Sequence, residues 1–335
     1  MKSQLNAGVI GLGVGEQHVH ALTSHPGCNL VSACDIDPEK RKAVASRFPQ
    51  VKMTAEPADL IDDPSIDLLC IASYDDAHFE QMDRAITNGK HIFVEKPLCL
   101  REDHLKRVRE RLNEYPNVRL SSNLILRLSP RFRDLKERVE DGSFGQLYFI
   151  AGDYNYGRVE KITHGWRGQL DFYSIMLGGG VHIVDLLLWL TGHKVDEVMA
   201  QGNAIATEGT DFRFNSLATS ILRFESGIVG SVTANFACVT PHFHKFSVYG
   251  TEATFENSVD YGLLYTSRDP AVPAERLSTE YPGVHKGSLL LDFVESLLEE
   301  SISEISVDEI FDTMSVCFAI EKSMTTGNST KVNYI

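Results

Sequence analysis

The first third of the chain alternates short apolar runs with stretches of helical periodicity. The apolar runs are AGVIGLG, NLVSACD, IDLLCIAS and HIFVEKP, and polar, helix-favouring segments follow them. Asp37 and Pro38, for example, supply an N-cap and a first-turn proline for a helix through Phe48. Strands that alternate with helices at this spacing predict right-handed βαβ crossovers and a doubly wound parallel sheet that ends near residue 122.

The alternation of predicted strands and helices ends after residue 123. A helix is expected over residues 130–140, and then apolar–polar alternation predicts the strands QLYFIAGDYNYG, VDEVMAQGNAIA, SLATSILRF, GIVGSVTANFACV and HKFSVYG. Two helices finish the chain, and Ser306 and Glu309 form a capping box for the second. We therefore expect an α/β domain over residues 1–122 and an α+β domain over residues 123–335 with a large, mostly antiparallel open sheet.

Composition narrows the class of protein. A length of 335 residues exceeds one ordinary core and supports two domains, and a formal net charge of −14 argues against a nucleic-acid partner. No apolar run approaches the roughly 20 residues that cross a bilayer, and the N-terminus lacks a signal-peptide pattern. The six cysteines are scattered without a CxxC pair, which favours reduced thiols. We expect a cytoplasmic protein without a membrane partner.

A glycine-rich turn joins the first apolar run to the first helix. In the segment Gly11-Leu12-Gly13-Val14-Gly15, the first two glycines let the backbone approach a pyrophosphate at the helix N-terminus. Glu16 stands where the fingerprint has its third glycine, and Gly15 gives room one position earlier. Asp35 ends the second strand, where an acid binds a ribose 2′-hydroxyl and repels a 2′-phosphate. The turn predicts NAD rather than NADP, with a tight turn of any α/β protein as the alternative.

Two further pairs of residues are candidates for chemistry. Ser73 and His78 follow the third apolar run, at the sheet edge where doubly wound domains bind ligands, and capping of the next helix explains the aspartates between them equally well. His242 and His244 lie two residues apart on a strand and so share a face. No third ligand is evident for them, and we predict no metal site.

Longer stretches resemble the family of glucose-fructose oxidoreductase, inositol dehydrogenase and rhizopine catabolism proteins (Gfo/Idh/MocA). They are GLGVGEQH, IASYDDAHFEQMDRAITNGKHIFVEKPL, RLSPRFRDLKERVEDGSFGQLYF, GWRG and, in part, GGGVHIVDLLLWLTG. The resemblance covers essentially the whole chain. It implies a Rossmann domain for NAD, a substrate-binding and oligomerisation domain, and a homo-oligomer, either a dimer or a tetramer.

The resemblance also implies the catalytic residues. It places Lys96 of Glu95-Lys96-Pro97 beside the nicotinamide, where its charge stabilises a developing alkoxide. It places His182 in the substrate pocket, and a neutral imidazole oriented by Asp185 is a credible general base. A surface lysine paired with Glu95 and a core histidine are the alternatives. Many family members carry an aspartate four residues before this histidine. Gly178 stands there, so either Lys96 and His182 act without the aspartate, or another group such as Tyr173 or Asp185 substitutes.

The stretch DYNYGRVEKITHGWRG before the His182 helix is rich in aromatic and basic residues. Its aromatic rings suit a sugar or base, and Arg167 or Lys161 suits a phosphate or carboxylate. Arg127 matches a family position near the pocket, although a salt bridge is its simplest role. The predicted substrate-binding residues are Lys96, Arg127, Tyr156, Trp166, Arg167, Tyr173, His182 and Asp185. The predicted cofactor-binding residues are Gly11, Gly13, Val14, Gly15, Asp35, Ser73, His78, Glu95 and Lys96.

Together these observations predict an NAD-dependent dehydrogenase that acts on a secondary alcohol of a sugar, sugar nucleotide or cyclitol. Two alternatives stay open. One is an NAD-dependent glycosidase or epimerase with transient redox chemistry. The other is a non-catalytic sensor or regulator that binds a dinucleotide on the same scaffold.

Overall fold

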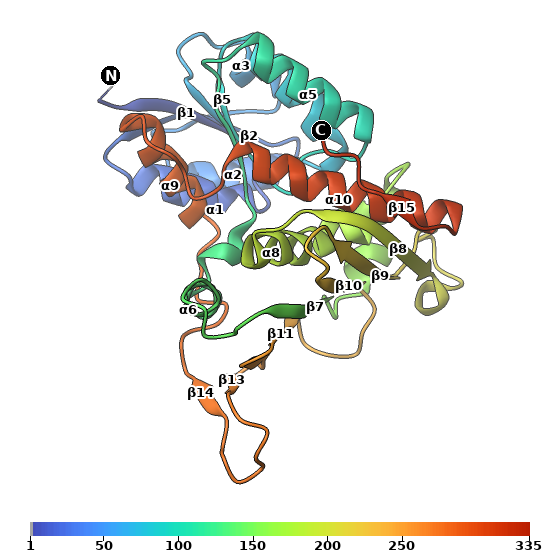
Figure 1. Ribbon diagram of the computed structural model, residues 1–335. Helices are drawn as coiled ribbons and strands as arrows, with labels where there is room; N and C mark the ends of the chain where they lie inside the picture. Colours follow the sequence, from blue (N-terminus) through green and yellow to red (C-terminus); the bar gives the residue numbers. More distant parts are fainter. Residues whose placement is uncertain (1–2) are drawn as a thin grey trace. The chain divides into compact units, whose positions relative to one another are not determined.

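The computed structural model describes residues 3–335, and the chain divides into two compact units (Figure 1). Unit 1 comprises the residues up to 125, residues 285–311 and Ile335; unit 2 comprises residues 126–284 and 312–334. The first division lies three residues after the boundary expected at 122. Residues 285–311 belong to unit 1, whereas the sequence analysis assigned them to the second domain. The reason is packing: Phe293 of α9 (Ser288–Leu298) lies 6.3 Å from the ring of Phe93 in the first sheet.

Unit 1 is built on a six-stranded parallel sheet in the order β3-β2-β1-β4-β5-β6. Its strands are β1 (Leu5–Ile10), β2 (Cys28–Cys34), β3 (Lys52–Thr54), β4 (Leu68–Ile71), β5 (His91–Val94) and β6 (Leu120–Ser122). Its helices before β6 are α1 (Gly15–Ser24), α2 (Pro38–Arg47), α3 (Ala58–Ile61), η1 (Asp75–Ala77), α4 (His78–Thr87) and α5 (Glu102–Glu114).

The strand order of unit 1 reverses at β1, which hydrogen-bonds β2 on one side and β4 on the other. This topological switch point opens a crevice at the carboxyl ends of the strands, where doubly wound sheets bind ligands. The apolar runs of the sequence are these strands, and β4 is buried along its whole length. The Rossmann fold expected from the sequence is confirmed.

Unit 2 is built on a nine-stranded sheet in the order β14-β13-β12-β11-β7-β10-β9-β8-β15. Within this sheet, as far as the structure describes it, only the pairing of β7 with β10 is parallel. Its strands are β7 (Leu147–Asn155), β8 (Val195–Asn203), β9 (Leu217–Phe224), β10 (Val229–Asn235), β11 (Phe243–Gly250), β12 (Thr254–Asn257), β13 (Gly262–Tyr265), β14 (Glu275–Leu277) and β15 (Thr330–Lys331). The mostly antiparallel open sheet expected from the sequence is confirmed.

One face of the second sheet carries helix α8 (Val181–Thr191), which lies along the sheet in Figure 1. The helix approaches β7 closely because β7 has Gly152 under it. A Cβ at position 152 would stand 2.5 Å from Cγ2 of Ile183. The remaining helices of unit 2 and its flanks are η2 (Ile125–Leu128), α6 (Pro130–Glu140), α7 (Glu160–Thr163), η3 (Trp166–Gln169), η4 (Met176–Gly180), η5 (Ile205–Thr207) and α10 (Val307–Thr326).

The helix caps expected at the starts of α2 and α10 are present. Asp37 accepts a hydrogen bond from the backbone N–H of Glu39 at the start of α2, and Ser306 and Glu309 form the reciprocal capping box. The short strands β12 to β14 and the π-helical turn η4 are not among the elements that the sequence predicts. Within residues 3–335, no helix is both long and apolar enough to cross a membrane.

Candidate active site

The glycine turn between β1 and α1 has the geometry that a bound dinucleotide needs. Gly11 has φ +90°, and a Cβ there would overlap the carbonyl oxygen of Ala72. At Gly13, by contrast, an added Cβ would meet no atom within 4 Å, so the space in front of this backbone is open. A Cβ at Gly15 would stand 3.1 Å from Ala72 Cβ and from Val9 Cγ1. Gly15 therefore serves the close helix–strand packing that the third glycine of the fingerprint usually serves.

Glu16 turns away from the glycine turn. Its carboxylate accepts a hydrogen bond from the guanidinium of Arg47 on α2, and His20 lies 3.8 Å from it one helical turn on. An acid in the first turn of a helix also complements the helix dipole. The substitution of the third glycine is thus compatible with an anion at the turn.

Asp35 links the end of β2 to the glycine turn. Its side chain is 7% exposed; one carboxylate oxygen accepts the N–H of Leu12 at 2.7 Å, and the other accepts the N–H of Asp37 at 2.8 Å. The guanidinium of Arg41 donates to the backbone carbonyl of Asp35 at 2.5 Å, and Lys40 Nζ lies 3.7 Å from the carboxylate. Two basic side chains of α2, Lys40 and Arg41, therefore both contact Asp35.

Glu95, the residue before Lys96, is a buried carboxylate at the centre of a small polar network. It lies 3.0 Å from Nε2 of His18 and accepts a hydrogen bond from the amide of Asn123 at 2.7 Å. Burial opposes ionisation, but the hydrogen bond from His18 and the charges of His18 and Lys96 lower the pKa of Glu95 to about 2. The carboxylate is therefore ionised at neutral pH, one residue before Lys96, which is partly buried.

His78 contacts the segment Glu95-Lys96-Pro97 through the backbone of Pro97. Its side chain is fully buried, with Nδ1 2.8 Å from the carbonyl oxygen of Pro97 and Nε2 3.3 Å from that of Ser73. The hydroxyl of Ser73 donates to Gln81 at 2.8 Å. The imidazole thus bridges the loops that follow β4 and β5 and fixes the backbone next to Lys96. The sequence predicts a cofactor contact at His78, and in the structure this histidine bridges two loops.

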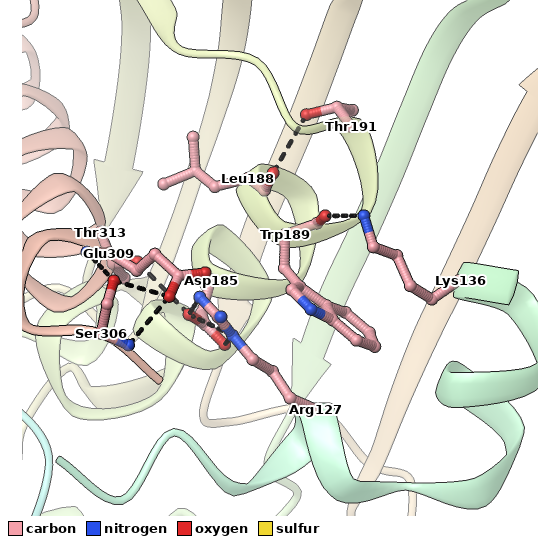
Figure 2. A network of polar contacts seen from close by, with 9 residues as sticks. All are labelled: Arg127, Lys136, Asp185, Leu188, Trp189, Thr191, Ser306, Glu309 and Thr313. Atoms are coloured by element: carbon pink, nitrogen blue, oxygen red, sulfur yellow. Dashed lines mark hydrogen bonds and ion pairs between the residues drawn. The ribbon is translucent and has the colours of Figure 1, made fainter. Parts of the chain in front are cut away.

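In unit 2, Arg127 and Asp185 form a buried ion pair, which Figure 2 shows. Each side chain is 1% exposed, and Nη2 of Arg127 lies 2.7 Å from Oδ1 of Asp185. Nε of Arg127 contacts both carboxylate oxygens at 3.0 and 3.1 Å, and Thr313 donates to Oδ1 at 3.4 Å. The salt bridge named as the simplest role of Arg127 is present. Asp185, expected to orient His182, is bound by this guanidinium.

His182 lies in the first turn of α8, directly after the π-helical turn η4, and is 7% exposed. Its ring stacks on that of Tyr154 from β7, with centroids 6.0 Å apart and an interplanar angle of 20°. Tyr154 also contacts the rings of Tyr156, Phe236 and His242 at 6.0, 5.7 and 5.1 Å. The glycine at 179 makes this possible, because a Cβ there would stand 2.5 Å from the Tyr154 ring.

Tyr154 was missed in the sequence analysis, which selected Tyr156. Strand alternation is the signal that identifies it, since Tyr154 on β7 lies two residues before Tyr156, the first residue after the strand, and residues two apart share a face. His18 and Asn123 were also missed, because their contacts with Glu95 span 77 and 28 residues.

The other candidates of unit 2 lie on the segment that leads into η4. Nε of Arg167 donates to the hydroxyl of Tyr173 at 3.1 Å, and the guanidinium lies over the ring of Trp166, 4.4 Å from its centroid. The Tyr173 ring is buried, and its hydroxyl occupies the space that a Cβ at Gly178 would need. Tyr173, Trp166 and Arg167 are thus brought together, whereas Lys161 is exposed.

His242 and His244 share a face as expected, with ring centroids 4.8 Å apart. Nδ1 of His244 contacts the hydroxyl of Tyr281, and burial, with a smaller contribution from His242, lowers the pKa of His244 to about 3. Nδ1 of His242 lies 3.1 Å from the carbonyl oxygen of Asn155. In the described part of the chain, no three His, Cys, Asp or Glu side chains are grouped as metal ligands would be.

Two models of one protein family match the chain. Residues 5–123 match "Oxidoreductase family, NAD-binding Rossmann fold", and residues 132–256 match "GFO/IDH/MocA C-terminal domain". A scyllo-inositol 2-dehydrogenase (NAD(+)) of Bacillus subtilis strain 168 is 29% identical over 262 residues, which cover 76% of this chain and 74% of that protein. A myo-inositol 2-dehydrogenase of Thermotoga maritima is 26% identical over 256 residues, or 74% and 73% of the two chains.

Solved structures resemble the fold over nearly the full length. A levoglucosan dehydrogenase in complex with NADH superposes with a TM-score of 0.87 at 21% identity, covering 99% of this chain and 100% of that one. A myo-inositol 2-dehydrogenase from Lactobacillus plantarum gives 0.85 at 20% identity, with 98% and 100% covered.

Proposed function

This chain belongs to the Gfo/Idh/MocA family of NAD-binding oxidoreductases, and we propose that it oxidises a secondary alcohol of a sugar, sugar nucleotide or cyclitol. One observation in unit 1 carries the proposal. The open dinucleotide turn at Gly13 follows β1, and Lys96 follows β5 of the same parallel sheet. Parallel strands present their carboxyl ends at one edge of the sheet, so Lys96 and the glycine turn lie at the same edge. The substrate class is supported by relatives named inositol dehydrogenases.

Lys96 is the proposed electrostatic catalyst. Its ammonium stabilises the negative charge that develops on the substrate oxygen as the hydroxyl proton leaves. The ionised carboxylate of Glu95 and the buried ring of His78 hold the backbone on both sides of this lysine. When bound, NAD supplies the hydride acceptor. Asp35 is the proposed partner of its ribose, and the turn at 11–15 the proposed site of its pyrophosphate.

His182 is the proposed general base for the hydroxyl proton. A ring stacked on Tyr154 and fixed at the start of α8 has little rotational freedom, which favours proton transfer at one atom. The ion pair of Arg127 with Asp185 supports the proposal by locking α8 through its next turn. Tyr156 is a proposed substrate contact because its ring lies in the same aromatic cluster.

We also propose that the chain forms a homo-oligomer, a dimer or a tetramer, through the face of the second sheet opposite α8. Met199 and Ile221 pair across β8 and β9 on that face and are 52% and 60% exposed. Apolar side chains exposed on a sheet face favour a second copy as partner. Light scattering tests this, and a monomer across micromolar concentrations contradicts it. A location in the cytoplasm belongs to the same proposal, supported by the scattered thiols of the sequence.

The dehydrogenase proposal is tested by incubating the protein with NAD⁺ and a panel of inositols, hexoses, anhydrosugars and sugar nucleotides. Net accumulation of NADH with at least one compound is expected. A glycosidase or epimerase that uses NAD transiently converts substrate without net NADH, and a sensor binds without conversion. Either of these two results across the panel contradicts the proposal.

A further inference from the structure

A cavity of about 270 Å³ opens in unit 2, between the C-terminal half of α10, the segment that leads into η4 and the loop before β9. Aromatic and aliphatic side chains form part of its wall, and these are Phe172, Tyr173, Ile175, Phe214 and Met324. Polar side chains complete the wall, and the carboxylate of Glu321 is one of them. A cavity that combines apolar walls with a few fixed polar groups is the usual form of a small-molecule site.

The carboxylate of Glu321 is held in place at this cavity by the segment that leads into η4. Its Oε1 accepts a hydrogen bond from the hydroxyl of Ser174 at 2.5 Å. The oxygen of that hydroxyl accepts the backbone N–H of Leu177 at 3.0 Å, and Ser174 is buried, so the hydroxyl has a fixed orientation. A carboxylate fixed in this way loses little conformational entropy when it binds a ligand.

This carboxylate has no cationic partner among the side chains of residues 3–335. Burial raises the pKa of Glu321 to about 7, and the hydrogen bond from Ser174 opposes the rise. Arg213 also lines the cavity, but its guanidinium donates to the Leu170 carbonyl at 3.3 Å and lies 3.9 Å from the carboxylate of Asp171. Above about pH 7 a negative charge therefore lies in the cavity wall without a counter-ion from the chain, and a bound cation supplies one.

Two phenylalanine rings complement an organic cation at this position. Phe172 and Phe214 line the cavity edge to face, with ring centroids 6.1 Å apart, and Phe172 is 41% exposed. The faces of such rings attract a cation, and their apolar surface favours contact with an organic body. A metal ion fits the wall less well, because no three His, Cys, Asp or Glu side chains are grouped as ligands in the part of the chain that the structure describes.

We propose that this cavity binds a small molecule that carries an ammonium group on an aromatic or aliphatic body. The ammonium forms an ion pair with Glu321, and the body packs against Phe172 and Phe214. The cavity is lined by residues of unit 2, and neither Lys96 nor His182 is one of them. The proposal therefore goes beyond the dehydrogenase function and does not depend on it.

Pairs of an amine and its alcohol test the proposal. The pairs are butylamine and 1-butanol, 2-phenylethylamine and 2-phenylethanol, and tryptamine and tryptophol. Calorimetry measures their binding to the full chain at about pH 8 with NAD⁺ present, where the amines are protonated and Glu321 is largely ionised. We expect at least one amine to bind about 10- to 100-fold more tightly than its alcohol, the contribution of a hydrogen bond to a charged group. Amines that bind no more tightly than their alcohols in all three pairs overturn the proposal.

Variants of Glu321 connect the preference to this carboxylate. Glu321→Gln keeps the size of the side chain and removes its charge, so the tighter binding of the amine should be lost, whereas Glu321→Asp should retain part of it. The matched control is Glu299→Gln at the exposed end of α9, which should bind the amine as the wild-type protein does. Thermal unfolding of each variant monitors folding. An unchanged ratio of amine to alcohol affinity in folded Glu321→Gln also overturns the proposal.

Discussion

The guanidinium of Arg127 encloses the carboxylate of Asp185, with 2.7 Å between Nη2 and Oδ1 and both side chains almost fully buried. The indole of Trp189 lies beside the pair, 5.9 Å from the guanidinium, and Lys136 donates to the Trp189 carbonyl at 2.8 Å (Figure 2). The pair joins η2 to the middle of α8, the helix whose first turn carries His182. Its role is therefore to fix the helix that carries the proposed base.

Removing one member of this pair should destabilise unit 2 strongly. Asp185→Asn leaves the Arg127 charge buried without its counter-ion, and we expect a loss of about 3–5 kcal/mol in the free energy of unfolding. The double variant Arg127→Met/Asp185→Leu should recover most of this loss, because no buried charge remains. Urea unfolding of the three proteins measures the difference. Equal stability of Asp185→Asn and the wild-type protein would show that the pair is not structural.

Glu321 should make the stability of the protein depend on pH near neutrality. Burial raises its pKa to about 7, although the hydrogen bond from Ser174 at 2.5 Å lowers it in part. The ordinary value is 4.5. Folding therefore favours the protonated form, so the associated stability is complete below about pH 4.5 and is lost as the pH rises through about 7.

The variant Glu321→Gln removes this titration. Its stability relative to the wild-type protein should increase from pH 4.5 to pH 8, by up to about 3 kcal/mol. Thermal unfolding at several pH values measures the increase, with Glu299→Gln at the exposed end of α9 as a control. Parallel pH profiles for Glu321→Gln and the wild-type protein would refute the assignment.

Gly178 should tolerate no side chain. A Cβ at this position overlaps the hydroxyl of Tyr173 and stands 2.9 Å from its Cζ. We expect Gly178→Ala to lose about 1–3 kcal/mol of stability through overpacking. Adding Tyr173→Phe should recover part of the loss, since the oxygen is then absent. The control is Gly13→Ala, because an added Cβ meets no atom within 4 Å there and the variant therefore measures the effect of an alanine without a steric clash. Gly209→Ala would not serve, because φ is +77° at that position and any side chain there strains the backbone. A fully stable Gly178→Ala contradicts the packing described.

Asp35 should set the preference for NAD over NADP. Asp35→Asn keeps an oxygen that accepts the Leu12 N–H but removes the charge that repels a 2′-phosphate. The ratio of the Kd values for NADP and NAD should fall by about tenfold or more, with Lys40 and Arg41 then available to favour the phosphate. Fluorescence titration with both reduced cofactors measures the ratio. The control is Asp37→Asn at the cap of α2. An unchanged ratio of the two Kd values in Asp35→Asn would show that Asp35 does not set the cofactor preference.

The sequence predicted the elements that periodicity encodes and missed those set by distant contacts. The buried runs of unit 1 and the alternating strands β7 to β11 were identified because their patterns repeat over several residues. The strands β13 and β14 have only four and three residues, too few to show alternation. The glycines of η4 favour a loop in isolation, and packing of Tyr154 and Tyr173 against them explains the π-helical turn.

The candidate site was predictable as a set of residues but not as a set of contacts. The order of glycines, acid and Glu-Lys-Pro motif indicated the cofactor edge of unit 1. The partners of Glu95 and Asp185 lie up to 77 and 128 residues away in the chain, so spacing cannot reveal them. For this reason the sequence connected Asp185 with its helix neighbour His182, and the structure connects it with Arg127.

The central claim is that Lys96 performs chemistry and does not merely hold the cofactor. The most direct test is Lys96→Met, with Lys106→Met on α5 as an exposed control. For each variant, kcat/KM for the best substrate and the Kd for NADH are measured on the same preparation. We predict that kcat/KM falls by about a hundred- to ten-thousandfold in Lys96→Met while the Kd for NADH stays that of the wild-type protein. Undiminished turnover in this variant would contradict the account.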